Sequence, residues 1–299
     1  MSTEQREFSI GPVGCDVTSA QCKATITRLA DPSALSVRDR DAIGERVVKT
    51  GEVFGLGGVP LMAVDGHLEA LRKTLLWCLG LDRHDLVDAA TEIIAEARPI
   101  ALLGGEGTEA RQLAAAIHSA SPQREGMLME FATSELPALG HFFGATVCVD
   151  LRKVHKITAP FARGLLDDRS RGLRAVFLAD HERQLHARID RYCDRVRTVT
   201  LTPLAQRPDD VIRLLGILWR ELGSTRNVME LGPSARSLGT HHRWPRDLHE
   251  LREHAPRLLA YVEHGRVVRV AARALGVSHQ TLYRHLSRLG IKTVDEADP

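Results

Sequence analysis

The sequence predicts a multidomain α+β protein with an N-terminal antiparallel β-sandwich, a central α/β domain and a C-terminal all-α helix-turn-helix. Three observations predict this order. Short apolar runs broken by turn residues fill the first part of the chain, helix-like and strand-like segments then alternate, and two linked helical patterns close it. The expected boundaries are 1–66 for the sandwich, 67–87 for a helical linker, 88–240 for the α/β domain and 241–299 for the helix-turn-helix domain.

Composition limits the classes of protein to consider. A chain of 299 residues is long enough for two or three domains, and its 43% of hydrophobic residues supports buried cores. No apolar run approaches the roughly 20 residues that cross a bilayer. The first residues, MSTEQREFSI, lack the basic start and apolar stretch of an export signal. We therefore expect a cytoplasmic protein with no membrane partner.

Cysteine and histidine show no metal-binding pattern. The five cysteines are spread along the chain without a CxxC pair, so incidental or buried thiols are expected rather than a disulfide framework. The 14 histidines are scattered too, and we interpret them as surface residues. We expect no metal site.

The sandwich is predicted from the runs FSI, ATITRL, ALSV and VPLMAV, which Gly, Asp and Pro separate. The order FSIGPVGCDV, CKATITRL, ALSVRDRDAIGERVV, KTGEVFGLGGVPLMAV resembles a forkhead-associated domain, whose usual ligand is a phosphothreonine peptide. Its binding positions are occupied here by Pro12, Ala20 and Ile43, which give a phosphate no charged partner. One interpretation is a scaffold that contacts a protein partner; the other is a sandwich that only packs against the central domain.

The linker is predicted to be helical. In LEALRKTLLWCLG, four leucines fall on one side of a helix, namely Leu68, Leu71, Leu75 and Leu76.

The central domain begins with a strand, a glycine-rich turn and a helix in ARPIALLGGEGTEARQLAAAIHSASP. A turn of this kind at a helix N-terminus is a usual cradle for phosphate. The segment resembles the AAA+ domain of enhancer-binding activators of sigma-54 RNA polymerase, whose nucleotide-loop helix ends in Ala-Ile-His, here residues 116–118. Four later segments resemble the same family in the same order: FATSELPALGH, ATVCVDLRKV, RIDRYCDRVRTVTLTPLAQRPDDVIRLL and RWPRDLHELREHAPRLL.

The catalytic positions that the resemblance implies are mostly lost. Ala110 stands where the family has the Walker A lysine, and Glu109 stands where it has the preceding glycine. Asp150 retains the Walker B aspartate, but the following glutamate is Leu151, and an apolar side chain cannot act as a general base. The sensor positions fall on Asp180 or His181 and on His249, while Arg188 matches the arginine finger.

From these substitutions we expect a catalytically silent domain: no cofactor, and a protein that is not an enzyme. The loop with which the family contacts the polymerase is also expected to be missing. Only ten residues separate Leu136 from Val147, too few for the insertion that the family carries there.

The strongest functional signal is the segment from Gly265 to Lys292. Its first helix is predicted from an apolar stripe of Val268, Ala271, Ala272 and Leu275, and a tight turn follows at Gly276 and Val277. Ser278 is a natural N-cap for the second helix, which presents one apolar face of Leu282, Leu286 and Leu289.

The remaining face is polar and basic. From His264 to Lys292 there are six Arg or Lys residues and no carboxylate, so positive charge collects where the two helices would meet DNA. His279 and Gln280 are expected to read bases, Arg284 and Arg288 to hold phosphates, and Arg269 and Arg273 to touch the flanking backbone. The full predicted set is Arg269, Arg273, Ser278, His279, Gln280, Thr281, Tyr283, Arg284 and Arg288.

The run AARALGVSHQTLYRHLSRLGI resembles the Fis-type helix-turn-helix that closes enhancer-binding regulators. The resemblance implies binding of double-stranded DNA as a homodimer through this domain. The alternative for the segment is a basic hairpin that packs on its own protein.

Three functions follow from this reading. The first is a sequence-specific DNA-binding transcription regulator without ATPase activity, which acts by promoter occupancy or partner recruitment. The second is an active AAA+ ATPase that activates sigma-54 transcription with unorthodox residues. The third is an interaction scaffold that modulates a related regulator.

Overall fold

The structure is a computed structural model that describes residues 10–12, 25–28, 34–38, 45–49, 53–56, 59–63, 66–96, 98–132, 139, 142–154 and 157–293. The chain forms two compact units, Met1–Thr74 and Leu75–Pro299, each of which is described by itself. Among the described residues, no helix combines the length and the apolar character that crossing a bilayer requires.

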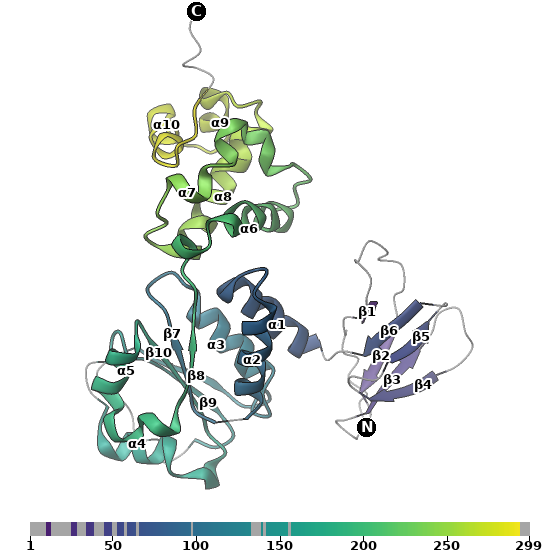
Figure 1. The fold of residues 1–299 in the computed structure, drawn as a ribbon, viewed down its shortest axis with the longest axis vertical. Coiled ribbons are helices and arrows are strands. Elements are labelled where there is room, and N and C mark those ends of the chain that lie inside the picture. Colours follow the sequence, from purple (N-terminus) through teal and green to yellow (C-terminus); the bar gives the residue numbers. More distant parts are fainter. Residues whose placement is uncertain are drawn as a thin grey trace, which may run out of the picture. The chain divides into compact units, whose positions relative to one another are not determined.

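The first unit contains two three-stranded antiparallel sheets (Figure 1). One has the order β1-β6-β5, built from Ile10–Pro12, Val59–Ala63 and Val53–Leu56. The other has the order β2-β3-β4, built from Thr25–Arg28, Ala34–Arg38 and Glu45–Lys49. Of the positions assigned to phosphopeptide binding, Pro12 ends β1, whereas Ala20 and Ile43 lie outside the described residues. Helix α1, Gly66–Leu79, follows the strands and crosses into the second unit.

The second unit is built on a five-stranded parallel sheet with the order β11-β7-β10-β9-β8. The strands are Arg197–Thr200, Ile100–Leu103, Arg174–Ala179, Thr146–Asp150 and Leu128–Phe131. Every residue of the three central strands is buried, as in a parallel sheet covered on both faces. Their continuous apolar runs explain why IALL, TVCVD and RAVFLA form strands rather than surface helices.

Helices cover both faces of this sheet (Figure 1). Helices α2, His84–Ala95, and α3, Ala110–Ser119, lie on one face. Helices α4, Ala159–Leu166, and α5, Glu182–Ile189, lie on the other. The core of that second face joins strand and helix side chains, among them Val149, Phe177, Phe161, Leu165 and Leu185. The central domain therefore has the predicted α/β fold with a parallel sheet.

A helical region follows the sheet. It contains α6, Pro208–Glu221; α7, Leu238–His241; α8, Asp247–Glu263; α9, Val268–Ala274; and α10, His279–Arg288. Trp219 of α6 is fully buried, and its indole nitrogen donates a hydrogen bond to the carbonyl of Ala255 in α8 at 3.0 Å. Pairing the polar end of the ring allows so large a side chain to lie in the interior.

Buried histidines at α8 correct the expectation that all histidines lie on the surface. His254 is 3% exposed, and its ring lies 5.5 Å from that of His285 in α10. His242 is nearly buried as well, and its Nε2 lies 2.9 Å from a carboxylate oxygen of Glu250. The expectation was wrong because polar side chains enter a core when they find partners there, which a one-dimensional pattern does not reveal.

The buried histidine predicts a pH dependence of stability. Burial lowers the pKa of His254 to about 4, against an ordinary value of 6.5. Between pH 6.5 and pH 4.5, His254 is protonated in the unfolded chain but stays mostly neutral in the folded chain. The free energy of unfolding should therefore fall by about 2 kcal/mol over this range. Urea unfolding across this range should show a clearly flatter pH dependence for His254→Gln than for the wild type. The exposed His84→Gln should keep the wild-type dependence, and an unchanged slope in His254→Gln would contradict the assignment.

Candidate functional site

Helices α9 and α10 are joined by the tight turn that the sequence predicts. Gly276 has φ +66°, in the left-handed region that glycine adopts without strain, and the Val277 nitrogen donates to the Ala272 carbonyl at 3.0 Å. Ser278 caps α10, because its hydroxyl oxygen accepts a hydrogen bond from the Thr281 nitrogen at 3.1 Å. The predicted cap is confirmed.

Apolar side chains hold the two helices on the protein. Val268, Ala271 and Ala272 of α9 are fully buried, and so are Leu282 and Leu286 of α10. The predicted apolar stripes therefore form the inner faces of both helices. Small alanine side chains let the helices pack closely.

The residues predicted to contact DNA lie on the outer faces. Seven are exposed and two, Thr281 and Tyr283, are half-buried; the exposed ones are Arg269, Arg273, Ser278, His279, Gln280, Arg284 and Arg288. Within the described part of the chain, none of these four arginines has an acidic side chain as a partner. Their positive charge is therefore available to an external anion.

Sequence reasoning missed Ser287, which is exposed on the same face of α10. Together with His279, Gln280, Tyr283 and Arg284 it lines a hollow of about 310 Å³. The signal was present in the sequence, because Gln280, Tyr283, Arg284 and Ser287 have the i, i+3, i+4, i+7 spacing of one helix face.

A second candidate site lies at the carboxyl ends of the parallel strands. Twelve residues line a cavity of about 570 Å³ there, within the usual size of small-molecule sites. The chain leaves β7 through a loop into α3 on one side, while Asp150 ends β9 and Asp180 follows β10. Residues at the N-terminus of α8, Arg246 and His249, form the opposite wall.

The loop between β7 and α3 fits closely against α8. Gly107 has φ +92°, and a Cβ atom there would clash with the carbonyl oxygen of Arg246. The Gly107 carbonyl accepts a hydrogen bond from the His249 nitrogen at 3.1 Å. Three non-glycine residues around this junction adopt left-handed backbone, namely Glu109, Trp244 and Asp247 with φ of 59°, 50° and 51°. Such conformations persist only where surrounding contacts hold them.

Glu109 is neutralised rather than left as a bare repelling charge. Its carboxylate is almost fully buried and accepts hydrogen bonds from Nε and Nη2 of Arg252 in α8. The Arg252 guanidinium also lies over the Trp77 ring, 4.6 Å from its centre. Burial works to lower the pKa of Arg252, but the hydrogen bond and charge of Glu109 outweigh it and raise the pKa. Arg252 was absent from the predicted site.

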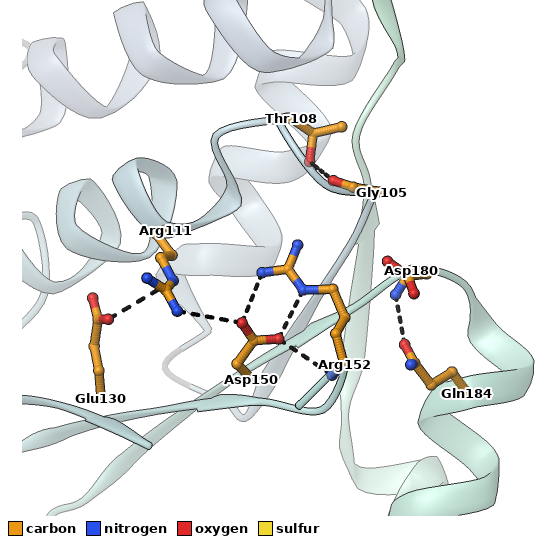
Figure 2. A network of polar contacts seen from close by, with 8 residues as sticks. All are labelled: Gly105, Thr108, Arg111, Glu130, Asp150, Arg152, Asp180 and Gln184. Atoms are coloured by element: carbon orange, nitrogen blue, oxygen red, sulfur yellow. Dashed lines mark hydrogen bonds and ion pairs between the residues drawn. The ribbon is translucent and has the colours of Figure 1, made fainter. Parts of the chain in front are cut away.

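Asp150 is the centre of a polar network (Figure 2). Its Oδ1 accepts from Arg152 Nε at 2.7 Å, and its Oδ2 accepts from Arg152 Nη2 at 3.0 Å. Arg111 Nη2 approaches Oδ2 at 3.5 Å. Burial acts to raise the pKa of Asp150, but the hydrogen bonds and charge of Arg152 outweigh burial, and the pKa lies below its ordinary value. Asp150 is thus an ionised carboxylate held by two arginines.

The other positions assigned by resemblance are divided between the core and the cavity. Leu151 is fully buried in the core, and Ala110 is buried at the start of α3 while lining the cavity. Asp180 and His249 also line it, whereas His181 caps α5 and Arg188 lies within that helix. Lys153 lines the cavity too, and sequence reasoning had not singled it out.

A nucleotide, which the resemblance of the sequence implies, commonly binds together with a metal ion, and the residues present do not favour that metal. Both oxygens of Asp150 already accept hydrogen bonds from Arg152, and Arg111 also approaches Oδ2, so two positive charges already surround this carboxylate. Among the described residues, no group of three His, Cys, Asp or Glu side chains is arranged to hold a metal ion.

Comparison with protein families found no matching family, and comparison with curated proteins found no match. Solved structures do match. NtrX from Brucella abortus in complex with ATP is 14% identical over 69% of this chain and 68% of that chain, with a TM-score of 0.46. Another NtrX structure from Brucella abortus is 15% identical over 75% and 71%, with a TM-score of 0.46. Thermotoga maritima RuvB, a Holliday junction branch migration motor, is 10% identical over 70% and 70%, with a TM-score of 0.49.

The central domain of this chain is an α/β domain with a five-stranded parallel sheet. The solved structures correct one expectation. The prediction that the protein is not an enzyme is contradicted, because the matching structures are of AAA+ ATPases, one of them in complex with ATP.

The close contact at Gly107 predicts a sharp difference between two glycines of one loop. Gly107→Ala should lower the free energy of unfolding by about 3 kcal/mol, because it combines a left-handed backbone with a clash against the Arg246 carbonyl. Gly105→Ala should change it by less than about 0.5 kcal/mol, since no atom lies within 4 Å of a Cβ there. Chemical denaturation of both variants measures the difference, and equal stabilities would refute this packing.

Proposed function

We propose that the protein is a sequence-specific DNA-binding transcription regulator of the sigma-54 activator type, which contacts duplex DNA through α9 and α10. One observation carries the proposal. The outer face of these helices presents arginines that have no acidic partner in the described part of the chain, beside an N-capped helix with polar side chains in its first turn.

The dimensions and charge of α10 suit the major groove. A helix of ten residues is about 15 Å long, and the major groove, about 12 Å wide, admits an α-helix. Polar side chains lie at its N-terminal end and arginines lie further along. Arg269 and Arg273 of α9 are placed to meet the flanking phosphates.

The mode of regulation follows from what lies between Leu136 and Val147. Ten residues leave no room for the polymerase-contacting insertion of the family. The proposed mode is therefore promoter occupancy or recruitment of a partner, by a homodimer paired through the C-terminal domain. The N-terminal unit, proposed to be forkhead-associated-like, is the proposed contact for a protein partner.

A second function is supported by the cavity at the carboxyl ends of the strands. Ligands of open α/β sheets bind at this edge, and the cavity combines a suitable volume with a loop that leads into the N-terminus of α3. Lys153 is a cationic wall residue without a described partner. The proposed ligand is a nucleotide whose phosphates lie near Lys153.

The DNA-binding proposal is tested by titrating the full chain with genomic duplex fragments at several salt concentrations. The logarithm of the binding constant should fall linearly with the logarithm of salt concentration. Arg273→Ala should weaken binding to all fragments alike and reduce the slope by about 1, because it removes one phosphate contact. The matched control is Arg220→Ala, which removes an exposed arginine of α6 and should leave the slope unchanged. A wild-type binding constant that depends neither on salt concentration nor on the sequence of the fragment would refute the proposal.

The nucleotide proposal is tested by calorimetry with ATP. The wild type should bind, and Lys153→Ala should bind about tenfold more weakly through loss of one charge-assisted contact. Lys73→Ala, at an exposed lysine of α1, is the charge-matched control and should bind like the wild type. Absence of binding heat with the wild type would rule out this function.

A further inference from the structure

One line of side chains runs along the outer face of α10. Gln280, Tyr283, Arg284 and Ser287 follow each other at i, i+3, i+4 and i+7, so they form a single stripe on a helix. The hollow of about 310 Å³ lies over this stripe. The stripe is therefore a concave surface, unlike the evenly convex face of an ordinary solvated helix.

The stripe points away from the protein. Arg284 is two residues from both Leu282 and Leu286, which are buried, and two residues correspond to about 200° around a helix. Arg284 thus occupies the middle of the face opposite to the core. Its guanidinium has no described partner, so all five of its N–H donors are available.

Arg288 has a different position, although sequence reasoning assigned both arginines to phosphates. It is the last residue of α10 and it does not line the hollow, whereas Gln280, which lies equally far around the helix from Arg284 on the other side, does line it. A side chain on the flank at the end of a groove-bound helix meets the wall of the groove, which is backbone. The side chain at the centre of the face meets the floor, where the base edges lie.

We propose that Arg284 is the residue that specifies the DNA site, by reading a guanine, and that Gln280 reads a nearby adenine, whereas Arg288 holds a phosphate. This assignment rests on the proposed function, DNA binding by α10. An arginine on the groove floor pairs with O6 and N7 of guanine through two parallel hydrogen bonds, and a glutamine pairs with N6 and N7 of adenine.

The distance between Gln280 and Arg284 along α10 determines how far apart the two recognised bases lie. Four residues along a helix advance about 6 Å, close to two base-pair steps of about 3.4 Å. The structure thus assigns a half-site in which an adenine and a guanine are separated by one base pair. Ser287, about 4.5 Å further along, faces the next one or two base pairs, where a hydroxyl can pair with any base and discriminates little.

The test is selection of binding sites from random duplex DNA by the full chain, with each variant compared at one salt concentration. Wild-type sites should contain the guanine and adenine at that spacing. Arg284→Lys keeps the charge but loses the paired geometry, so preference for guanine should fall about tenfold at that one position while affinity for random DNA changes little. Gln280→Ala should relax only the adenine position.

Arg288 supplies the matched control. Arg288→Ala should weaken binding to selected and random DNA alike, reduce the salt slope by about 1 and leave the preferred sequence unchanged. Arg284 and Arg288 are both exposed, so thermal unfolding of each variant should coincide with that of the wild type.

Three results overturn the assignment while leaving DNA binding intact. They are an unchanged guanine preference in Arg284→Lys, a selected site without guanine, and a single relaxed position in Arg288→Ala. A wild-type protein that selects no sequence at all overturns the proposed function itself, which separates the two failures.

Discussion

The contact between the loop 104–109 and α8 holds the parallel-sheet part of the second unit against its helical part, and the arrangement of both candidate sites depends on it. Glu109 carries a buried carboxylate, and a buried charge without a partner is strongly destabilising. Arg252 supplies that partner from a helix 143 residues away in the chain. Because Gly107 meets the backbone of Arg246 at the same junction, the loop and α8 are held together by charge and by shape.

This junction connects the two candidate sites. The first turn of α8 forms one wall of the cavity, and the rest of the helix packs against α6 and α9. Its His254 lies against His285 of α10. A single helix of 17 residues therefore has one end at the cavity and its buried face against the helices that present the arginines.

Sequence patterns predicted those features of the fold that depend on residues close together in the chain. A continuous apolar run identified strand β7, and a serine beside a glycine turn identified the start of α10, because these features depend on neighbouring residues. The partner of Glu109 could not be predicted from such patterns, since Arg252 is remote in sequence. The same approach assigned His254 to the surface, because burial depends on which elements pack together. The role of Ser287 was accessible from spacing alone and was overlooked.

The absence of carboxylates between His264 and Lys292 bears on how copies of this chain meet one another. Six positive charges on so short a segment repel the same segment of a second molecule, and nothing within the segment offsets them. Two such segments lie near each other more readily when salt or a polyanion screens this charge. On the proposed DNA site, the phosphates of the duplex would supply the counter-ions that allow two copies to lie side by side.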